Sequence, residues 1–504
     1  MAQAQLHKVE KMMLFLTILF LPLNGLPKAI SLPIIGGNAS HWFFLLGLLV
    51  LIFEFIKYGF EIPILFRRFL LIFTFWQITC LAIGIIFYPY NSYLTIDQSP
   101  HLQALLLWMN SYGIYLNELT ALKIWLFLRF TKDILLNANL LFYMCFYIYH
   151  LYVDNYDECF HDIRHAMLAL FLFMGTYSLI ELTWLKTGSE TAGNILSFIN
   201  PYLYDVKIIN HWWPPLLWNG QLRSLAHEPS FFGILSVFCL PFLWSYLYKS
   251  RKKILYGVLI GYFSLMIFAT NARTAIALAG VEVILLILSM FWIRKKVYTK
   301  TVISIILISA CAFSVNLINF PGLLNSDSND DFYSASSYYR SNIGSLGNKD
   351  SRSNNARLAN LIANLETIKD YPITGVGIGL KDAYIDDRLP EFSYTNYEVR
   401  NWSRDLHREG VLKSAYPPLN KYADVAVQNG IIGLIIFLLP FFYLLKKIHK
   451  HLRPYLCNVS ILFPIFSLIG LAGAWFSNSE YSECMGIIIG LLFCIDFDKD
   501  TMEN

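Results

Sequence analysis

Charged side chains that could do chemistry gather at a few places in a chain that is otherwise strongly apolar. Arg223, His227 and Glu228 lie close together in the sequence, and Pro229 follows at once. Proline favours the first turn of a helix, so the amides at this helix start are expected to point outward and attract an anion such as phosphate. Histidine and glutamate act as general bases, and arginine binds phosphate through two parallel hydrogen bonds. The alternative is structural: Glu228 caps the helix and Arg223 pairs with it.

A second arginine stands almost without a break between two apolar stretches. The sequence Ala-Thr-Asn-Ala-Arg-Thr-Ala-Ile leaves Arg273 at the turn between them. An arginine at membrane depth costs about 2.5 to 3.5 kcal/mol on insertion scales, and it normally has a partner or marks a pathway. Arg273 is therefore a candidate to bind a phosphate. The alternative is a turn residue whose guanidinium reaches the lipid headgroups.

A long polar block interrupts the apolar sequence from Phe320 to Val427. Loops between the helices of a bundle are short, so a block of this length is expected to be functional or separately folded. Its front half predicts an amphipathic helix that contains Arg357, a candidate phosphate-binding residue, and that ends before Pro372. The predicted apolar face consists of Leu358, Leu361, Ile362, Leu365 and Ile368.

A glycine-rich turn, Gly375-Val-Gly-Ile-Gly379, follows this predicted helix. It is not a P-loop, because no Gly-Lys-Ser/Thr follows, and no strand precedes it as in a dinucleotide fingerprint. Tight packing against the apolar helices is the structural interpretation.

The back half of the polar block is cationic. It contains Arg400, Arg404, His407 and Arg408, followed by Asn420 and the run up to the next apolar stretch. Arg404 and Asn420 are candidates to bind a substrate, and His407 is a candidate base. The alternative is an ordinary solvated surface.

The elements that must position these residues are membrane-spanning helices. Hydrophobic residues make up 56% of the 504 residues, charged residues only 15%, and the mean hydropathy is +0.48. The apolar stretches are about as long as the roughly 20 residues that a helix needs to cross a bilayer. Alternation typical of a β-barrel is absent. The sequence therefore predicts an all-α polytopic membrane protein.

Ten candidate spans precede the polar block and three follow it. They are 12–30, 42–56, 69–88, 116–130, 140–153, 167–184, 230–248, 254–270, 272–292 and 302–318, then 431–445, 459–476 and 484–495. Basic residues in short loops mark the cytoplasmic side, which places both termini in the cytoplasm and the polar block outside. Ten spans give the wrong parity for that arrangement. We expect one of the two weakest, 116–130 or 140–153, to be false, leaving about 12 spans in all.

Three parts of the chain follow from this pattern. Residues 1–319 form an N-terminal transmembrane bundle, 320–427 a large extracytoplasmic loop with short helices, and 428–504 the last spans with a short cytoplasmic tail. The approach to the span at 230, the turn at Arg273 and the large loop are expected to share the outer face. None of the eight cysteines lies in the large loop, and no spacing matches a zinc site. No cofactor, metal or nucleic acid is expected.

Taken in order, these motifs resemble the O-antigen polymerase and O-antigen ligase superfamily of bacterial surface-polysaccharide enzymes. The resemblance rests on Arg223 before Glu-Pro-Ser, on the Asn-Ala-Arg-Thr turn, and on Arg357 with its helix and glycine run before Asn-Gly-Ile-Ile-Gly. Ligases of the superfamily carry a His followed by Asn, Ser or Gln, and nine further residues then separate this position from Gly-x-x-Gly. Here Asn420 and Gly430 fit that spacing, but the His position is Leu419. We therefore favour the polymerase.

The resemblance implies a fold like that of GT-C glycosyltransferases and an enzyme of the bacterial cytoplasmic membrane. Its substrates would be polyprenyl-diphosphate-linked oligosaccharides, joined into O-antigen, capsule or exopolysaccharide with inversion and without a metal. Arg223 and Arg273, with Arg357 or Arg404, would stabilise the departing diphosphate, and Glu228 or His407, then His227, would be the base. Membrane lipid, a chain-length regulator and a flippase are the expected partners.

Two other functions stay open on the sequence. One is an O-antigen ligase that transfers the glycan to a lipid acceptor. The other, of a different class, is a flippase or exporter of lipid-linked oligosaccharides. A transporter is expected to show two similar halves with charges spread through the bundle. The sequence has no internal repeat, and its charges gather on one side.

Overall fold

The protein is helical wherever its structure is described. The computed structural model describes residues 2–32, 36–94, 99–153, 155–204, 220–318, 352–411, 416–450 and 458–495. Within these ranges the only β-type pairing is one isolated bridge between Leu32 and Gly36.

The described helices fall into three groups along the chain. The first group is α1 (Ala2–Leu19), α2 (Ala39–Tyr58), α3 (Ile64–Ile86), η1 (Asn91–Tyr93), α4 (Pro100–Ser111), α5 (Glu118–Asp133), η3 (Ile134–Ala138), α6 (Leu140–Leu151), α7 (Tyr156–Thr187) and α8 (Glu190–Leu203). The second is α9 (Pro229–Lys249), α10 (Lys253–Ala269), α11 (Arg273–Ser289) and α12 (Lys296–Asn316). The third is α14 (Arg352–Asp370), α15 (Lys381–Asp387), η6 (Glu391–Thr395), α16 (Tyr397–Glu409), α17 (Lys421–Lys450), α19 (Val459–Ala474) and α20 (Ser482–Phe493).

Many of these helices are built to lie in a membrane. Seven helical stretches in the described ranges are long and apolar enough to span it, and α10, α19 and α20 are shorter apolar helices. The chain is thus an all-α polytopic membrane protein, as the sequence predicts. The total of 12 spans and the GT-C architecture stay predictions.

The two weakest candidate spans are parts of one helical stretch. α5, the π-helical turn η3 and α6 run continuously from Glu118 to Leu151, over 34 residues. No glycine or proline interrupts this stretch. Asn139 donates a hydrogen bond to the carbonyl of Ile134, 3.1 Å away, and so supports the π-helical turn. One of these two candidates was expected to be false, and the structure agrees, since it has a single candidate span here.

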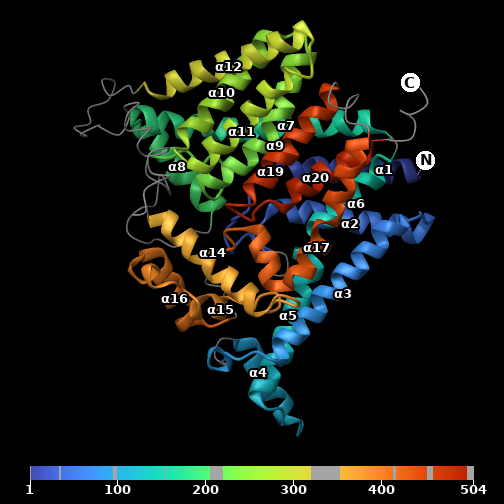
Figure 1. Cartoon of the computed structure of the whole chain (residues 1–504), viewed down its shortest axis with the longest axis vertical. Helices are drawn as coiled ribbons and strands as arrows, with labels where there is room; N and C mark the ends of the chain where they lie inside the picture. Colours follow the sequence, from blue (N-terminus) through green and yellow to red (C-terminus); the bar gives the residue numbers. More distant parts are fainter. Residues whose placement is uncertain are drawn as a thin grey trace.

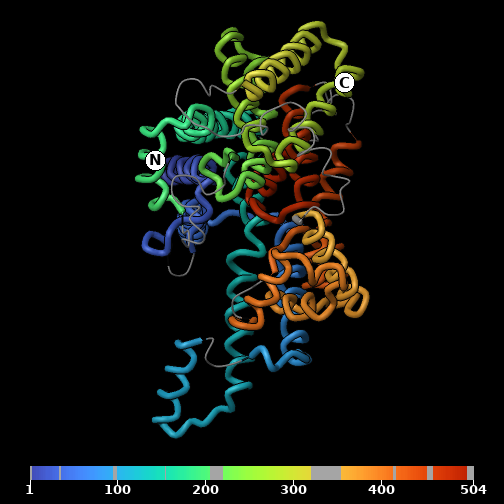
Figure 2. The backbone as a smooth tube through the Cα atoms, turned by 90° about the vertical axis from the view of Figure 1, so that its left-hand side faces the viewer, coloured from blue at the N-terminus to red at the C-terminus, as the bar shows by residue number. Residues whose placement is uncertain are grey.

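The large loop contributes a separate layer at one end of the bundle. Figure 1 shows α14, α15 and α16 at the end of the bundle where α9 begins, and the view at right angles in Figure 2 shows the same layer. In both views α4 extends beyond this layer, joined to the rest through α3 and α5. The layer therefore covers the end of the bundle to which the predicted site residues belong.

Helix α14 forms as predicted, but it buries a different face from the one its leucines suggest. Its buried positions are Ala356, Ala359, Asn360, Ala363, Asn364 and Thr367, whereas Leu358 and Leu365 are about half exposed, at 49% and 53%. Small side chains let the helix backbone come close to α17, against which α14 packs. Asn360 also donates to the carbonyl of Pro417 at 3.4 Å. The predicted apolar face is thus only partly buried, through Leu361, Ile362 and Ile368, because close backbone approach decides this contact.

The glycine-rich turn joins α14 to a kink in α17. The amides of Val376 and Gly377 donate to the carbonyls of Val427 and Gln428 at 2.9 and 3.0 Å, and Ile431 donates to Pro372 at 2.8 Å. All three glycines of the turn have positive φ, as does Gly430, whose φ of 70° and ψ of 178° bend α17. The turn also packs on α3, where a Cβ at Gly377 would lie 3.2 Å from the carbonyl oxygen of Cys80. These contacts favour the packing interpretation of the glycine run.

Candidate active site at the start of α9

Three polar regions far apart in the sequence meet where α9 begins. Asn271 donates to the carbonyl of Gly220 at 3.1 Å, and the amide of Leu222 donates to Ala269 at 2.9 Å. One turn into α9, a Cβ at Gly233 would lie 2.7 Å from the Cα of Ala275, so the first turns of α9 and α11 touch. The segment before α9 and the turn before α11 therefore share one end of the bundle.

Glu228 is the cap residue of α9 by position, but its carboxylate is not used as a cap. The side chain makes no hydrogen bond to the first amides of the helix, and it instead accepts from the Ser230 hydroxyl at 3.1 Å. It is partly exposed. The structural alternative for Glu228 was capping together with a pair to Arg223, and neither interaction is present in the described structure.

Arg357 brings the large loop to this point. Its guanidinium donates to the carbonyl of Ser477, in the connection between α19 and α20. Burial lowers the pKa of Arg357, the charge of Glu228 opposes this shift, and Arg273 adds to it. Glu398, at the start of α16, also acts on Arg357 and raises its pKa. Two arginines and Glu228, predicted separately from the sequence, are thus close enough to influence one another.

The connection between α19 and α20 adds charges that the sequence analysis missed. Burial raises the pKa of Glu480, as do Glu483 and Glu228, while Lys421 and His41 oppose the shift. His41 pairs with Glu483. The sequence pattern could have revealed these charges, because the polar run 477–483 separates the last two apolar stretches and falls on the predicted outer side.

Arg223 lies below this surface and is fully buried. Its guanidinium stacks on the ring of Tyr204, with the central carbon 3.7 Å from the ring centroid, and its Nε is 3.9 Å from Glu181 Oε1. The same carboxylate accepts from the amide of Ser224 at 2.8 Å, and Ser224 has a φ of 56° that few non-glycine residues adopt. In this arrangement Arg223 holds the segment that leads to Glu228.

His227 and Asn420 lie on either side of the cluster. His227 packs on the connection after α1, since a Cβ at Gly25 would lie 2.5 Å from its Cδ2. Asn420 accepts from the amide of Ala423 at 3.0 Å, which caps α17, and it donates to Phe476 at 3.4 Å. Both residues are partly exposed, and Asn420 contacts the connection that receives Arg357.

His407 and Arg404 lie elsewhere on the loop. His407 Nε2 is 3.1 Å from the hydroxyl of Tyr93 and 3.8 Å from Asp386 Oδ2, and Arg404 donates to Asn401 at 2.7 Å. His407 and Glu398 lie near opposite ends of α16, about 13 Å apart along the helix axis. The structure therefore separates His407 from Arg357 and Glu228.

A comparison with protein families agrees with this geometry. Residues 258–438 match the family described as O-antigen ligase. The matched region covers less than half of the chain. The match supports the O-antigen ligase and polymerase superfamily, and with it a membrane enzyme of surface-polysaccharide synthesis that acts on lipid-linked glycans. No curated protein matches the chain.

The O-antigen ligase match runs from within α10 to within α17. It includes Arg273, Arg357 and the glycine-rich turn, and it ends before the Glu480 connection. The segment that holds Arg223 and Glu228 precedes it. Half of the candidate site therefore comes from outside the matched region and reaches it through the packing of α9 on α11.

Proposed function

We propose that the chain polymerises polyprenyl-diphosphate-linked oligosaccharide repeat units into a surface polysaccharide. The reaction would take place on the outer face of the bacterial cytoplasmic membrane, with both termini in the cytoplasm. A flippase that delivers the repeats and a chain-length regulator would be its partners. The observation that supports the proposal is that Arg273 and Glu228 lie close enough to Arg357, at one end of the bundle, to shift its pKa.

The chemistry follows from what each group can do. A hydroxyl of the incoming lipid-linked repeat attacks the anomeric carbon of the growing glycan. The bond from that carbon to the polyprenyl diphosphate breaks, and the diphosphate leaves with the bonding electrons. Glu228 takes the proton of the attacking hydroxyl. Attack from the side opposite the leaving group inverts the anomeric centre, and no metal is needed at the reacting carbon.

Arg273 and Arg357 would stabilise the negative charge of the departing diphosphate. A guanidinium stays charged at any physiological pH and binds phosphate oxygens through two parallel hydrogen bonds. Partial burial of Arg357 strengthens such an interaction, because less water competes for it. Their mutual repulsion, which helps to lower the pKa of Arg357, would be relieved by a bound diphosphate.

The remaining candidates take supporting roles in this proposal. Arg223 positions the segment before Glu228, since its guanidinium is fully buried against Tyr204 and Glu181. His227 and Asn420 line the cluster. His407 and Arg404 lie toward the end of α16, away from Glu398, and in this proposal they contact the glycan rather than the reacting diphosphate.

The ligase is the second candidate, and it is favoured by the name of the matching family. Leu419 argues against it, because ligases of the superfamily have a His before the position of Asn420. A strain that lacks the chain separates the two functions. Loss of a polymerase leaves single repeats attached to their usual acceptor, whereas loss of a ligase leaves full-length polymer on its lipid carrier.

The same strain tests the site. It would be complemented with wild type, Glu228→Gln, Arg273→Ala, Arg357→Ala and the control Lys369→Ala, which removes an exposed cation from α14. We expect long chains from wild type and the control and single repeats from the other three, at equal protein levels in the membrane. Full restoration of long chains by both arginine variants would overturn the site assignment.

A further inference from the structure

Two glutamates and a histidine from three different helices come together at the other end of the bundle. They are Glu10 on α1, Glu54 on α2 and His150 on α6, each with one ligand atom within 4.8 Å of the other two. Glu54 lies on the same helix as His41, which belongs to the candidate active site, and is about 20 Å further along its axis. The cluster is therefore separate from the proposed reaction.

The carboxylate of Glu10 is buried and faces the carboxyl of Glu54. Its side chain is 0% exposed and that of Glu54 is 5% exposed, and apart from the facing carboxyl of Glu54 the Glu10 oxygens have no hydrogen-bond partner among the described residues. Glu54 has more polar partners than Glu10, since it accepts a hydrogen bond from Gln3 at 3.2 Å and lies 3.4 Å from His150 Nε2. Two buried carboxylates that face each other repel, so they either share a proton or bind a positive charge between them.

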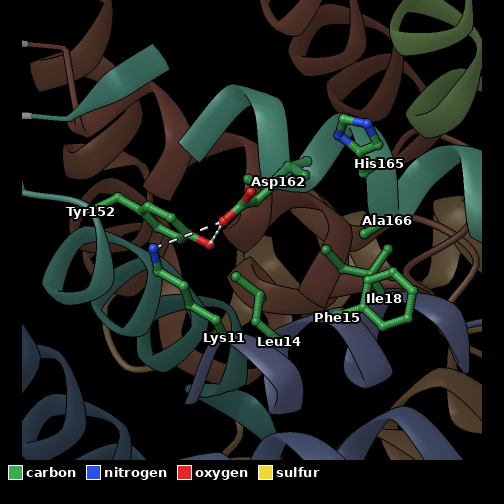
Figure 3. Close-up of a pocket in the computed structure, with 9 residues that line it drawn as sticks. Lys11, Leu14, Phe15, Ile18, Tyr152, Asp162, His165 and Ala166 are labelled. Carbon is green, nitrogen blue, oxygen red and sulfur yellow. Dashed lines mark hydrogen bonds and ion pairs between the residues drawn. The ribbon is translucent and has the colours of Figure 1, made fainter. Parts of the chain in front are cut away.

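Neighbouring cations do not supply that charge. Lys11 follows Glu10 in the chain, but its amine is 2.5 Å from Glu158 and 3.9 Å from Asp162. Figure 3 shows Lys11 beside a pocket between α1, α6 and α7, with its amine and the Tyr152 hydroxyl both directed to Asp162. His7 comes nearer, with its Nδ1 3.8 Å from Glu10 Oε2.

We propose that Glu10, Glu54 and His150 bind a divalent transition-metal ion of the Zn²⁺ type. Carboxylate oxygens together with an imidazole nitrogen suit Zn²⁺, whereas Mg²⁺ and Ca²⁺ prefer oxygen ligands alone. Neighbouring ligands of a tetrahedral Zn²⁺ are about 3.4 Å apart, so the three side chains need to move together only slightly. His7 is placed to be a fourth ligand.

Bound there, the ion would cross-link three helices at the membrane surface. α1, α2 and α6 hold no other ionic contact to one another in the described structure apart from this group. His150 and His7 are partly exposed, at 18% and 38%, which leaves the ion a path from solvent. The charge rule places this end in the cytoplasm, with Lys8, Lys11 and Lys57 around it.

The test uses the full-length chain without a histidine tag, purified in detergent and stripped with EDTA. Zn²⁺ would be titrated by calorimetry, and the bound metal counted by elemental analysis after dialysis. We expect one Zn²⁺ per chain and a Tm that rises when Zn²⁺ is added. Glu54→Gln and His150→Ala should each weaken binding by at least about tenfold and abolish the rise in Tm.

Two control variants keep the result specific. Glu158→Gln and His161→Ala remove a carboxylate and an imidazole on the same side of the bundle, outside the cluster. Both should bind Zn²⁺ as wild type does. Absence of stoichiometric Zn²⁺, or equal weakening in the controls, would overturn the proposal. If Glu54→Gln raises the Tm in EDTA, and wild type does not respond to Zn²⁺, the two carboxylates share a proton instead, and the proposal is overturned.

Discussion

Gly375 and Gly430 touch through their backbones: a Cβ at Gly375 would lie 2.7 Å from the amide nitrogen of Gly430. This contact joins the turn after α14 to the kink in α17. Since α14 carries Arg357 and α17 begins beside Glu480, the two glycines determine how the loop lies over the start of α9. The glycine motifs of this chain thus position the loop that carries Arg357 through close backbone packing.

We expect Gly430→Ala to lower the free energy of unfolding by about 3 kcal/mol or more. A positive φ costs an alanine about 1 to 2 kcal/mol, and the new Cβ would collide with the carbonyl of Ile373, for which overpacking adds about 1 to 3 kcal/mol. Thermal unfolding of the purified protein measures the effect.

Two other glycines serve as controls for Gly430. Gly113 has a φ of 74° but open space around it, so Gly113→Ala should show the backbone cost alone. Gly280 lies inside α11 with no positive φ and nothing within 4 Å, so Gly280→Ala should be neutral or stabilising. Equal Tm values for all three variants would contradict the packing role.

Removing the Arg223 guanidinium should destabilise the protein more than it changes the chemistry. Arg223→Ala leaves the carboxylate of Glu181 buried and without its cation, which typically costs about 3 to 5 kcal/mol. We expect a lower Tm, and partial recovery of it in the double variant Arg223→Met, Glu181→Gln. A normal Tm with lost polymerisation would instead place Arg223 in direct contact with the substrate.

The contribution of Arg357 to turnover should depend on the planar shape of its guanidinium and not only on its charge. Arg357→Lys keeps a cation but loses the paired hydrogen bonds, and we expect a fall in turnover of about 100-fold, close to that of Arg357→Ala. Initial rates with a purified lipid-linked repeat measure this. Wild-type turnover in Arg357→Lys would show that a point charge is sufficient there.

Glu480 should make stability depend on pH. Its pKa is raised in the folded protein, so the folded state holds its proton more tightly than the unfolded state does. Stability from this group is therefore present below the unfolded pKa of about 4.3 and is lost as the pH rises toward the raised value. Glu480→Gln should raise the Tm at pH 7 more than at pH 4. An equal change at both pH values would contradict this.

Sequence patterns predicted the properties that depend on neighbouring residues. Continuous apolar stretches predicted membrane helices, Pro229 predicted the start of α9, and Pro372 predicted the end of α14. Where the pattern was ambiguous, the sequence offered two candidate spans within 118–151 and did not reveal that they form one continuous helical stretch. The exposed leucines of α14 show a similar limit, because hydrophobicity alone does not reveal which face comes close to another backbone.

By itself, the sequence determined the class of the protein, the three polar regions and their common side, since hydrophobicity and loop charge act locally along the chain. Only the tertiary structure decided which charges meet. It joined Arg357 to Glu228 and Arg273, added Glu480, and kept His407 at the far end of α16. The physical reason is that electrostatic interactions depend on distances in space, and helix packing sets these distances between residues hundreds of positions apart.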